Sequence, residues 1–191
     1  MGKSRIDLAI KSMLFHIYPC NSIHGLLFVQ KIRFLYFMAL FLSSHVNRLD
    51  QKGRVSVPSA FRAQLEGEDF KGVVLFKSSA HQCLEGFTWS YMRSISDRLD
   101  DFNLFSSEQD DLATSIFGNA VQLPIDGNGR IILPAELIEF VGLTESASFV
   151  GMGTKFQIWC PERFADRQEN ARKAVQKEGL TIPNKRGGKA E

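Results

Sequence analysis

Two short stretches of the sequence combine an acidic residue, a glycine and an arginine at the same spacing. Residues 50–54 and 126–130 both begin with Asp and end with Gly-Arg, and 76 positions separate them. The planar guanidinium group of arginine donates two parallel hydrogen bonds, a geometry that suits a phosphate group or the edge of guanine. The two stretches therefore contain residues of a type that can bind an anion.

The two arginines differ in their sequence neighbours. Arg54 has Arg48 and Lys52 close by, whereas the position near Arg130 that matches Lys52 holds the neutral Asn128. Attraction to a polyanion grows with each phosphate that a cation neutralises. These five residues are the candidate anion-binding set, and we expect the first stretch to bind anions more strongly than the second.

The remaining residues of each stretch suit a tight turn. An aspartate side chain can accept a hydrogen bond from the backbone two residues on, and glycine tolerates positive φ at the end of a turn. We expect Asp50 and Asp126 to brace the turns and to orient the arginines, in preference to contacting a bound partner. We expect Gly53 and Gly129 to close the turns and to allow close approach of the backbone.

Each turn begins a longer internal repeat. An apolar-x-apolar-Pro pattern follows at residues 55–58 and 131–134. The apolar, β-branched residues favour a short strand, and the proline suits the first turn of a helix. Each copy reads as strand, turn, strand, helix, strand, strand, helix. The expected strands are 55–57, 73–76, 131–133, 148–150 and 156–159, and the expected helices are 59–65, 88–99, 107–117, 135–141 and 161–177, with a stop at Gly142.

The two copies match more weakly beyond the turns. Cys83-Leu84 aligns with Ile158-Trp159, and an aromatic residue follows five positions after each pair. Neither copy alone is long enough to bury a comfortable core. We therefore expect an α+β fold in which two pseudo-symmetric β/α units share one core, with amphipathic helices around it.

The repeat and the charge pattern divide the chain of 191 residues into segments. Residues 1–37 carry a net charge of +4 and precede every repeat element, so we expect an upstream extension with Met38 as the true start. A membrane or targeting segment and an additional helix are the alternatives for this extension. The other expected segments are unit one (44–90), an acidic helical linker (91–119), unit two (120–163), and a helix end with a basic, disordered tail (164–191).

The doubled pattern Asp-x-x-Gly-Arg, apolar-x-apolar-Pro and short helix resembles the MraZ family, whose members are built from two SpoVT-AbrB-type units. The resemblance covers residues 38–165. It implies a DNA-binding transcriptional regulator that represses its own cell-division and cell-wall gene cluster at repeated promoter boxes. With the repeat, it makes the candidate anion-binding set the expected DNA-binding residues: Arg54, Arg130, Lys52, Arg48 and Asn128. It also implies a ring-shaped homo-oligomer, and we expect a cytoplasmic, nucleoid-associated protein without membrane contact.

Patterns for other chemistries are weak or missing from the sequence. Residues 126–137 resemble a calcium-binding loop, but Leu137 stands where a glutamate ligand is required. The three cysteines are scattered and match neither a zinc site nor a disulfide framework. No phosphate loop or nucleophile elbow is present, so we expect no catalytic residues, no metal and no cofactor.

Two alternatives to a promoter-binding repressor remain open. An AbrB-type antitoxin would bind DNA with a similar module and would also bind a toxin, although such chains usually carry one copy of the motif. A non-enzymatic scaffold, or an unrecognised enzyme, is the other alternative. It would be favoured if Arg54 and Arg130 were buried in ion pairs away from any exposed face.

Overall fold

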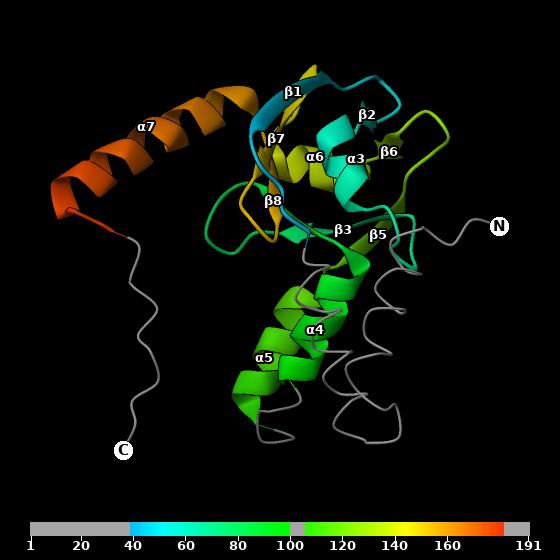
Figure 1. The fold of residues 1–191 in the computed structure, drawn as a ribbon, viewed down its shortest axis with the longest axis horizontal. Coiled ribbons are helices and arrows are strands. Elements are labelled where there is room, and N and C mark those ends of the chain that lie inside the picture. Colours follow the sequence, from blue (N-terminus) through cyan, green and yellow to red (C-terminus); the bar gives the residue numbers. More distant parts are fainter. Residues whose placement is uncertain (1–38, 100–105, 182–191) are drawn as a thin grey trace, which may run out of the picture. The chain divides into compact units, whose positions relative to one another are not determined.

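The computed structural model of the protein describes residues 39–99 and 106–181 (Figure 1). These residues belong to a compact unit that begins at Ala39. The extension expected over residues 1–37 and the end of the expected basic tail lie outside the described residues. Among the helices that the structure describes, none is both long and apolar enough to cross a membrane.

The same order of elements occurs in both halves of the described chain, as the repeat predicts. The helix α5 (Ser107–Ile116) follows the first half and precedes the second. The first half contains β1 (Ser44–Arg48), β2 (Arg54–Ser56), α3 (Ser59–Gln64), β3 (Gly72–Lys77), β4 (Leu84–Phe87) and α4 (Trp89–Leu99). The second half contains β5 (Val121–Pro124), β6 (Arg130–Ile132), α6 (Ala135–Val141), β7 (Ser146–Gly151), β8 (Phe156–Trp159) and α7 (Pro161–Glu178).

The strands pair mainly between the two repeats. One sheet has the order β1-β7-β8-β4-β3-β5, and a separate two-stranded sheet pairs β2 with β6. The first strand of each repeat thus lies beside the third strand of the other repeat: β1 pairs with β7, and β5 pairs with β3. Only the β3–β4 and β7–β8 pairings stay within one repeat. Neither repeat can complete its own sheet, so the expected α+β fold with two units sharing one core is confirmed.

The core lies where the two repeats meet. Phe41, Phe61, Phe149 and Phe156 are fully buried and contact one another through their ring edges and faces. Val55 and Ile131, the inward residues of the two-stranded sheet, are buried in the same cluster. Because these side chains come from both repeats, the packing holds the two-stranded sheet against the larger one.

The helices follow the sequence expectation closely. Pro58 and Pro134 immediately precede α3 and α6, and α6 ends at Gly142 in a left-handed conformation. Helix α4 packs beside α5 through an apolar cluster that includes Met92, Ile95 and Ile116 (Figure 1). Apart from its first turn, where Phe164 contacts Trp159, α7 buries little of its surface.

The alignment of Cys83-Leu84 with Ile158-Trp159 is wrong. Strand β4 and helix α4 begin at Leu84 and Trp89, whereas β8 and α7 begin at Phe156 and Pro161, so 72 positions relate these elements in the two halves. The offset therefore decreases from 76, its value at the turns, to 72. The physical reason is that the second repeat has fewer residues between its short helix and its last strand. A sequence comparison without gaps cannot align the elements on both sides of such a difference.

Candidate nucleic-acid interface

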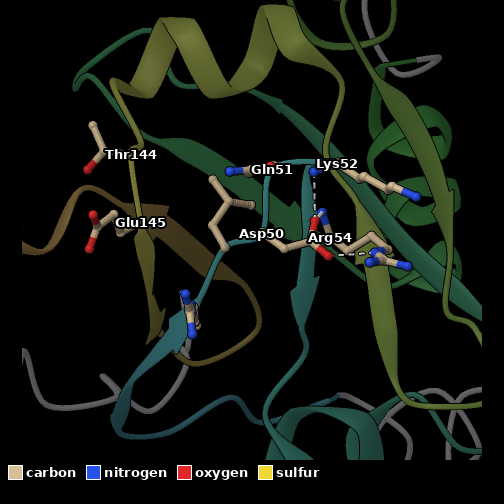
Figure 2. Close-up of a pocket in the computed structure, with 8 residues that line it drawn as sticks. Asp50, Gln51, Lys52, Arg54, Thr144 and Glu145 are labelled. Carbon is tan, nitrogen blue, oxygen red and sulfur yellow. Dashed lines mark hydrogen bonds and ion pairs between the residues drawn. The ribbon is translucent and has the colours of Figure 1, made fainter.

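Turn A, which we define as residues 50–53, precedes β2 and is held by one aspartate side chain (Figure 2). The Oδ1 atom of Asp50 accepts hydrogen bonds from the backbone N–H groups of Lys52 and Arg54, both at 2.9 Å. Its Oδ2 atom accepts a third hydrogen bond from Nε of Arg54 at 2.6 Å. A single carboxylate therefore fixes both the turn backbone and the arginine side chain.

Turn B, residues 126–129, repeats this arrangement before β6. Asp126 Oδ1 accepts from the backbone N–H groups of Asn128 at 2.8 Å and Arg130 at 2.9 Å. Its Oδ2 atom lies 3.0 Å from Nε and 2.9 Å from Nη2 of Arg130. The two turns are thus nearly equal in their internal hydrogen bonds, although their sequences differ at the two central positions.

The hydrogen bonds keep both carboxylates ionised. The backbone N–H of Arg54 is the largest cause that lowers the pKa of Asp50 from its ordinary 3.8, and the backbone N–H of Arg130 does the same for Asp126. Hydrogen bonds to the charged form of a carboxyl group favour that form. Each arginine therefore keeps an anionic partner at neutral pH, and each Asp–Arg pair carries no net charge.

Both turns end in a glycine because the backbone requires one there. Gly53 and Gly129 each have φ of +75°, the left-handed region that residues with a Cβ atom rarely adopt. A Cβ atom on Gly53 would lie 2.6 Å from the carbonyl oxygen of Leu133, which is closer than van der Waals contact allows. The backbone of turn A thus approaches the end of β6 directly, and the Leu133 N–H donates to Gly53 O at 2.8 Å.

The two arginines share one face of the two-stranded sheet, which we call the arginine ribbon (β2 and β6). Arg54 is paired with Ile132, and Ser56 is paired with Arg130. Side chains alternate along a strand, so these four point outward while the Val55–Ile131 pair points into the core. Diagonal neighbours on such a face lie about 7–8 Å apart. The register thus places both arginine side chains on one face of the ribbon.

The turns themselves lie at opposite ends of the arginine ribbon. Gly53 is bonded to Leu133 just beyond the end of β6, and Gly129 is bonded to Val57 just beyond the end of β2. Four residues along a strand separate the levels of the two turns, which corresponds to about 13 Å. The outward face therefore presents one arginine beside each turn, and the two turns lie at its opposite ends.

Both arginines are partly exposed. The side chain of Arg54 has a relative exposure of 37% and that of Arg130 has 33%, and both belong to an outward face. The scaffold alternative required arginines buried in ion pairs away from an exposed face. The ion pairs are present, but both arginine side chains remain partly exposed.

A hollow of about 440 Å³ lies beside turn A, lined by both basic and acidic side chains. Arg48, Lys52 and Arg54 line it together with Thr144 and Glu145. Figure 2 shows the Lys52 and Arg54 side chains extending to the same side, away from Thr144 and Glu145. The structure thus brings together the three basic residues that the sequence assigns to the first turn.

Arg62 is a basic residue near turn B that the motif comparison did not select. It lies on α3 in the first repeat, yet its guanidinium group packs against Gly129 in the second. The matching position in the second repeat, 76 residues later, holds Ile138. A systematic search for charge differences between the two copies would have found this residue.

The described residues offer no clear alternative chemistry. Within these ranges no group of three or more His, Cys, Asp or Glu side chains could hold a metal ion. Burial raises the pKa of the Cys83 thiol to about 12, so this cysteine stays protonated and is a poor nucleophile.

Comparisons with known proteins agree with the doubled architecture. A family model described as "MraZ protein, putative antitoxin-like" matches residues 40–114 and residues 116–181. The first match spans β1 to α5 and the second spans β5 to α7, so each contains one copy of the arginine turn.

Curated relatives are similar over most of the chain and carry one name, "Transcriptional regulator MraZ". The protein of Rickettsia akari (strain Hartford) is 40% identical over 147 residues, which cover 77% of this chain and 99% of that protein. The protein of Gluconobacter oxydans (strain 621H) is 44% identical over 138 residues, covering 71% and 84%. That of Rickettsia rickettsii (strain Sheila Smith) is 42% identical over 147 residues, covering 77% and 99%. The fold and the site thus define a two-repeat protein whose relatives are named as transcriptional regulators. The chain belongs to the MraZ family.

Proposed function

We propose that this protein regulates transcription by binding DNA with the arginine ribbon. One observation carries the proposal: two braced and partly exposed arginines share one outward face, with a glycine turn at each end. A narrow two-stranded ribbon of this kind fits the major groove of DNA, which admits a β-ribbon. The names of the curated relatives support the role in transcription.

The braced geometry suits recognition of an anion. The carboxylate of each turn binds Nε of its arginine, and in turn B also Nη2. Among the residues that the structure describes, the other N–H groups of the two guanidinium groups have no acceptor, so they can donate to a partner. An arginine held in one orientation loses less side-chain entropy when it binds. DNA phosphates and the O6 and N7 atoms of guanine are the acceptors that such a group recognises.

A single ribbon offers few cations, so we further propose that the protein acts as a homo-oligomer. Several ribbons in one assembly would raise the effective concentration at neighbouring DNA boxes. The MraZ family resemblance adds a ring-shaped assembly, repeated promoter boxes and repression of the protein's own cell-division and cell-wall cluster. Such a regulator would be cytoplasmic and associated with the nucleoid.

A mobility-shift assay with the DNA directly upstream of the protein's own gene tests this function. We expect binding at lower protein concentration than to random DNA of equal length, and we expect the double variant Arg54→Ala/Arg130→Ala to lose the preference. Arg172→Ala is the matched control, because Arg172 is exposed on α7, outside the ribbon. Equal binding by the double variant and the control would contradict the proposal.

Light scattering on the same samples tests the assembly. We expect a homo-oligomer, both free and bound to DNA. A monomer that binds its promoter tightly would show that a single ribbon suffices.

A further inference from the structure

Arg62 links the first repeat to the turn of the second. Its Nη1 atom donates a hydrogen bond to the carbonyl oxygen of Val57 at 2.6 Å. The N–H of the same Val57 donates to the carbonyl oxygen of Gly129 at 2.9 Å. Arg62 is therefore connected to turn B through one intervening residue of the backbone.

The guanidinium group of Arg62 also contacts turn B directly. A Cβ atom on Gly129 would lie 2.6 Å from Nη1 and 2.7 Å from Cζ of Arg62. The absence of a side chain at Gly129 thus makes room for the guanidinium group. This close approach places a positive charge next to the backbone of turn B.

The charge of Arg62 has no acidic partner among the described residues. The ion pairs that the structure shows there neutralise Arg54 with Asp50 and Arg130 with Asp126, but none includes Arg62. The side chain is half-buried, and a charge in such a position is screened less than one in open solvent. Asp126 and Arg130 neutralise each other, so Arg62 gives turn B and Arg130 together a net positive charge.

Turn A is held differently at the matching position. The Cδ1 atom of Ile138 would lie 3.3 Å from a Cβ atom on Gly53, and Ile138 has no group that could donate to the Leu133 carbonyl. The additional charge at turn A comes from Arg48 and Lys52, which line the hollow beside it. Additional positive charge thus comes to turn A from Arg48 and Lys52 beside the hollow, and to turn B from Arg62, which reaches it from α3.

We infer that Arg62 is a positioning residue for turn B and that its charge replaces there the charge that Lys52 brings to turn A. Only the second part of this inference, the role of the Arg62 charge, rests on the proposed DNA binding. Positioning of the turn is a property of the free protein. Attraction of DNA phosphate is a property of the complex.

Arg62→Met is the variant that separates these effects, because methionine keeps an unbranched apolar stem and removes the charge and the donors. Arg62→Lys restores the charge without the planar fork. Ile138→Met is the matched control at the equivalent position of the other repeat. Hydrogen exchange of the peptide that contains residues 126–130 is measured in the free protein, and promoter affinity is measured over a salt series.

We expect Arg62→Met to exchange its turn B amides roughly tenfold faster than the wild type, with turn A unchanged. Its promoter affinity should fall about three- to tenfold per engaged subunit, with a shallower salt dependence. Arg62→Lys should recover the salt dependence but not the slow exchange, and it carries the test if Arg62→Met fails to fold. Ile138→Met should leave turn B exchange and the salt dependence unchanged.

Unchanged exchange in a folded Arg62→Met protein would overturn the positioning role. A salt dependence that Arg62→Lys fails to restore would overturn the charge role. If the wild type binds no DNA, the proposed function fails, and the exchange measurement still decides whether Arg62 positions turn B.

Discussion

Turn A and turn B have the same aspartate, glycine and arginine at nearly the same distances, yet their surrounding charges come from different parts of the chain. Lys52 and Arg48 lie in or beside turn A itself, whereas turn B has Asn128 and receives Arg62 from the other repeat. The comparison teaches that the braced arginine is the common unit of the two copies. The supply of additional charge is what differs between them.

The largest effect should come from the arginines themselves. Arg54→Ala should weaken promoter binding by about 1–3 kcal/mol per DNA-contacting copy, and the loss recurs at each engaged subunit. We expect a smaller loss for Arg130→Ala, because the cations around Arg54 are the more exposed. Affinity for promoter and random DNA over a salt series measures both, with oligomer size checked. Unchanged affinity of Arg54→Ala in an intact oligomer would exclude turn A as the main contact.

The second effect concerns the glycines that close the turns. Alanine at a positive φ costs about 1–2 kcal/mol, and Gly53→Ala must also displace the Leu133 backbone. At Gly129 the nearest atoms belong to the flexible Arg62 side chain, which can move aside. We expect the free energy of unfolding to fall by about 2–4 kcal/mol for Gly53→Ala and by about 1–2 kcal/mol for Gly129→Ala. Denaturant titration measures the difference, and the reverse order would contradict this account of the two turns.

Exchanging the central residues of the turns should have a smaller effect on binding. Lys52→Asn gives turn A the residue of turn B, and Asn128→Lys does the opposite. We expect Lys52→Asn to weaken binding about threefold to tenfold with a shallower salt dependence, and Asn128→Lys to strengthen it. The double exchange should nearly restore the wild-type affinity. If both single variants bind like the wild type, the local charge at the turns does not contribute.

The smallest expected effect is the loss of folding stability in acid that comes from Asp50 and Asp126. The folded-state pKa values of Asp50 and Asp126 are lowered, so their contribution to stability is present above the ordinary 3.8 and is lost as the pH falls further. Asp50→Asn and Asp126→Asn should each remove part of the loss of stability below about pH 4. Unfolding curves from pH 2 to pH 6 measure this, and equal changes in the two variants are expected because the braces are alike. A change in only one variant would break the equivalence.

Much of the fold could be predicted because its signals are local. The turn motifs, the prolines and the apolar patterns lie within a few residues of the elements that they specify, and the predicted helices agree with the structure within about one residue at each end. The bounds of β1, β4 and β5 were not predicted. In β1, for example, Ser44–Arg48 alternates only weakly between polar and apolar residues. The exchange of strands between repeats could not be predicted either, since no local pattern specifies which distant strand becomes the neighbour.

The candidate site was partly predictable for the same reason. The bracing hydrogen bonds of Asp50 and Asp126 follow from spacing within one turn. Arg62 reaches turn B only because α3 packs across the interface between repeats. Such a contact depends on tertiary structure, and the spacing of residues within turn B does not predict it. The DNA-contacting role of the ribbon residues stays a prediction.

The exchange of strands also affects how the chain reaches its folded state. Strand β1 pairs with β7, about a hundred residues later in the chain, and β2 pairs with β6, where Val55 and its partner Ile131 are 76 positions apart. Contacts of this kind require the closure of long loops before any stabilisation is gained, which slows folding. During synthesis the first repeat leaves the ribosome without the strands that complete its sheet. Its apolar surfaces therefore stay uncovered until the second repeat has emerged, and a truncated chain should aggregate where the whole chain folds.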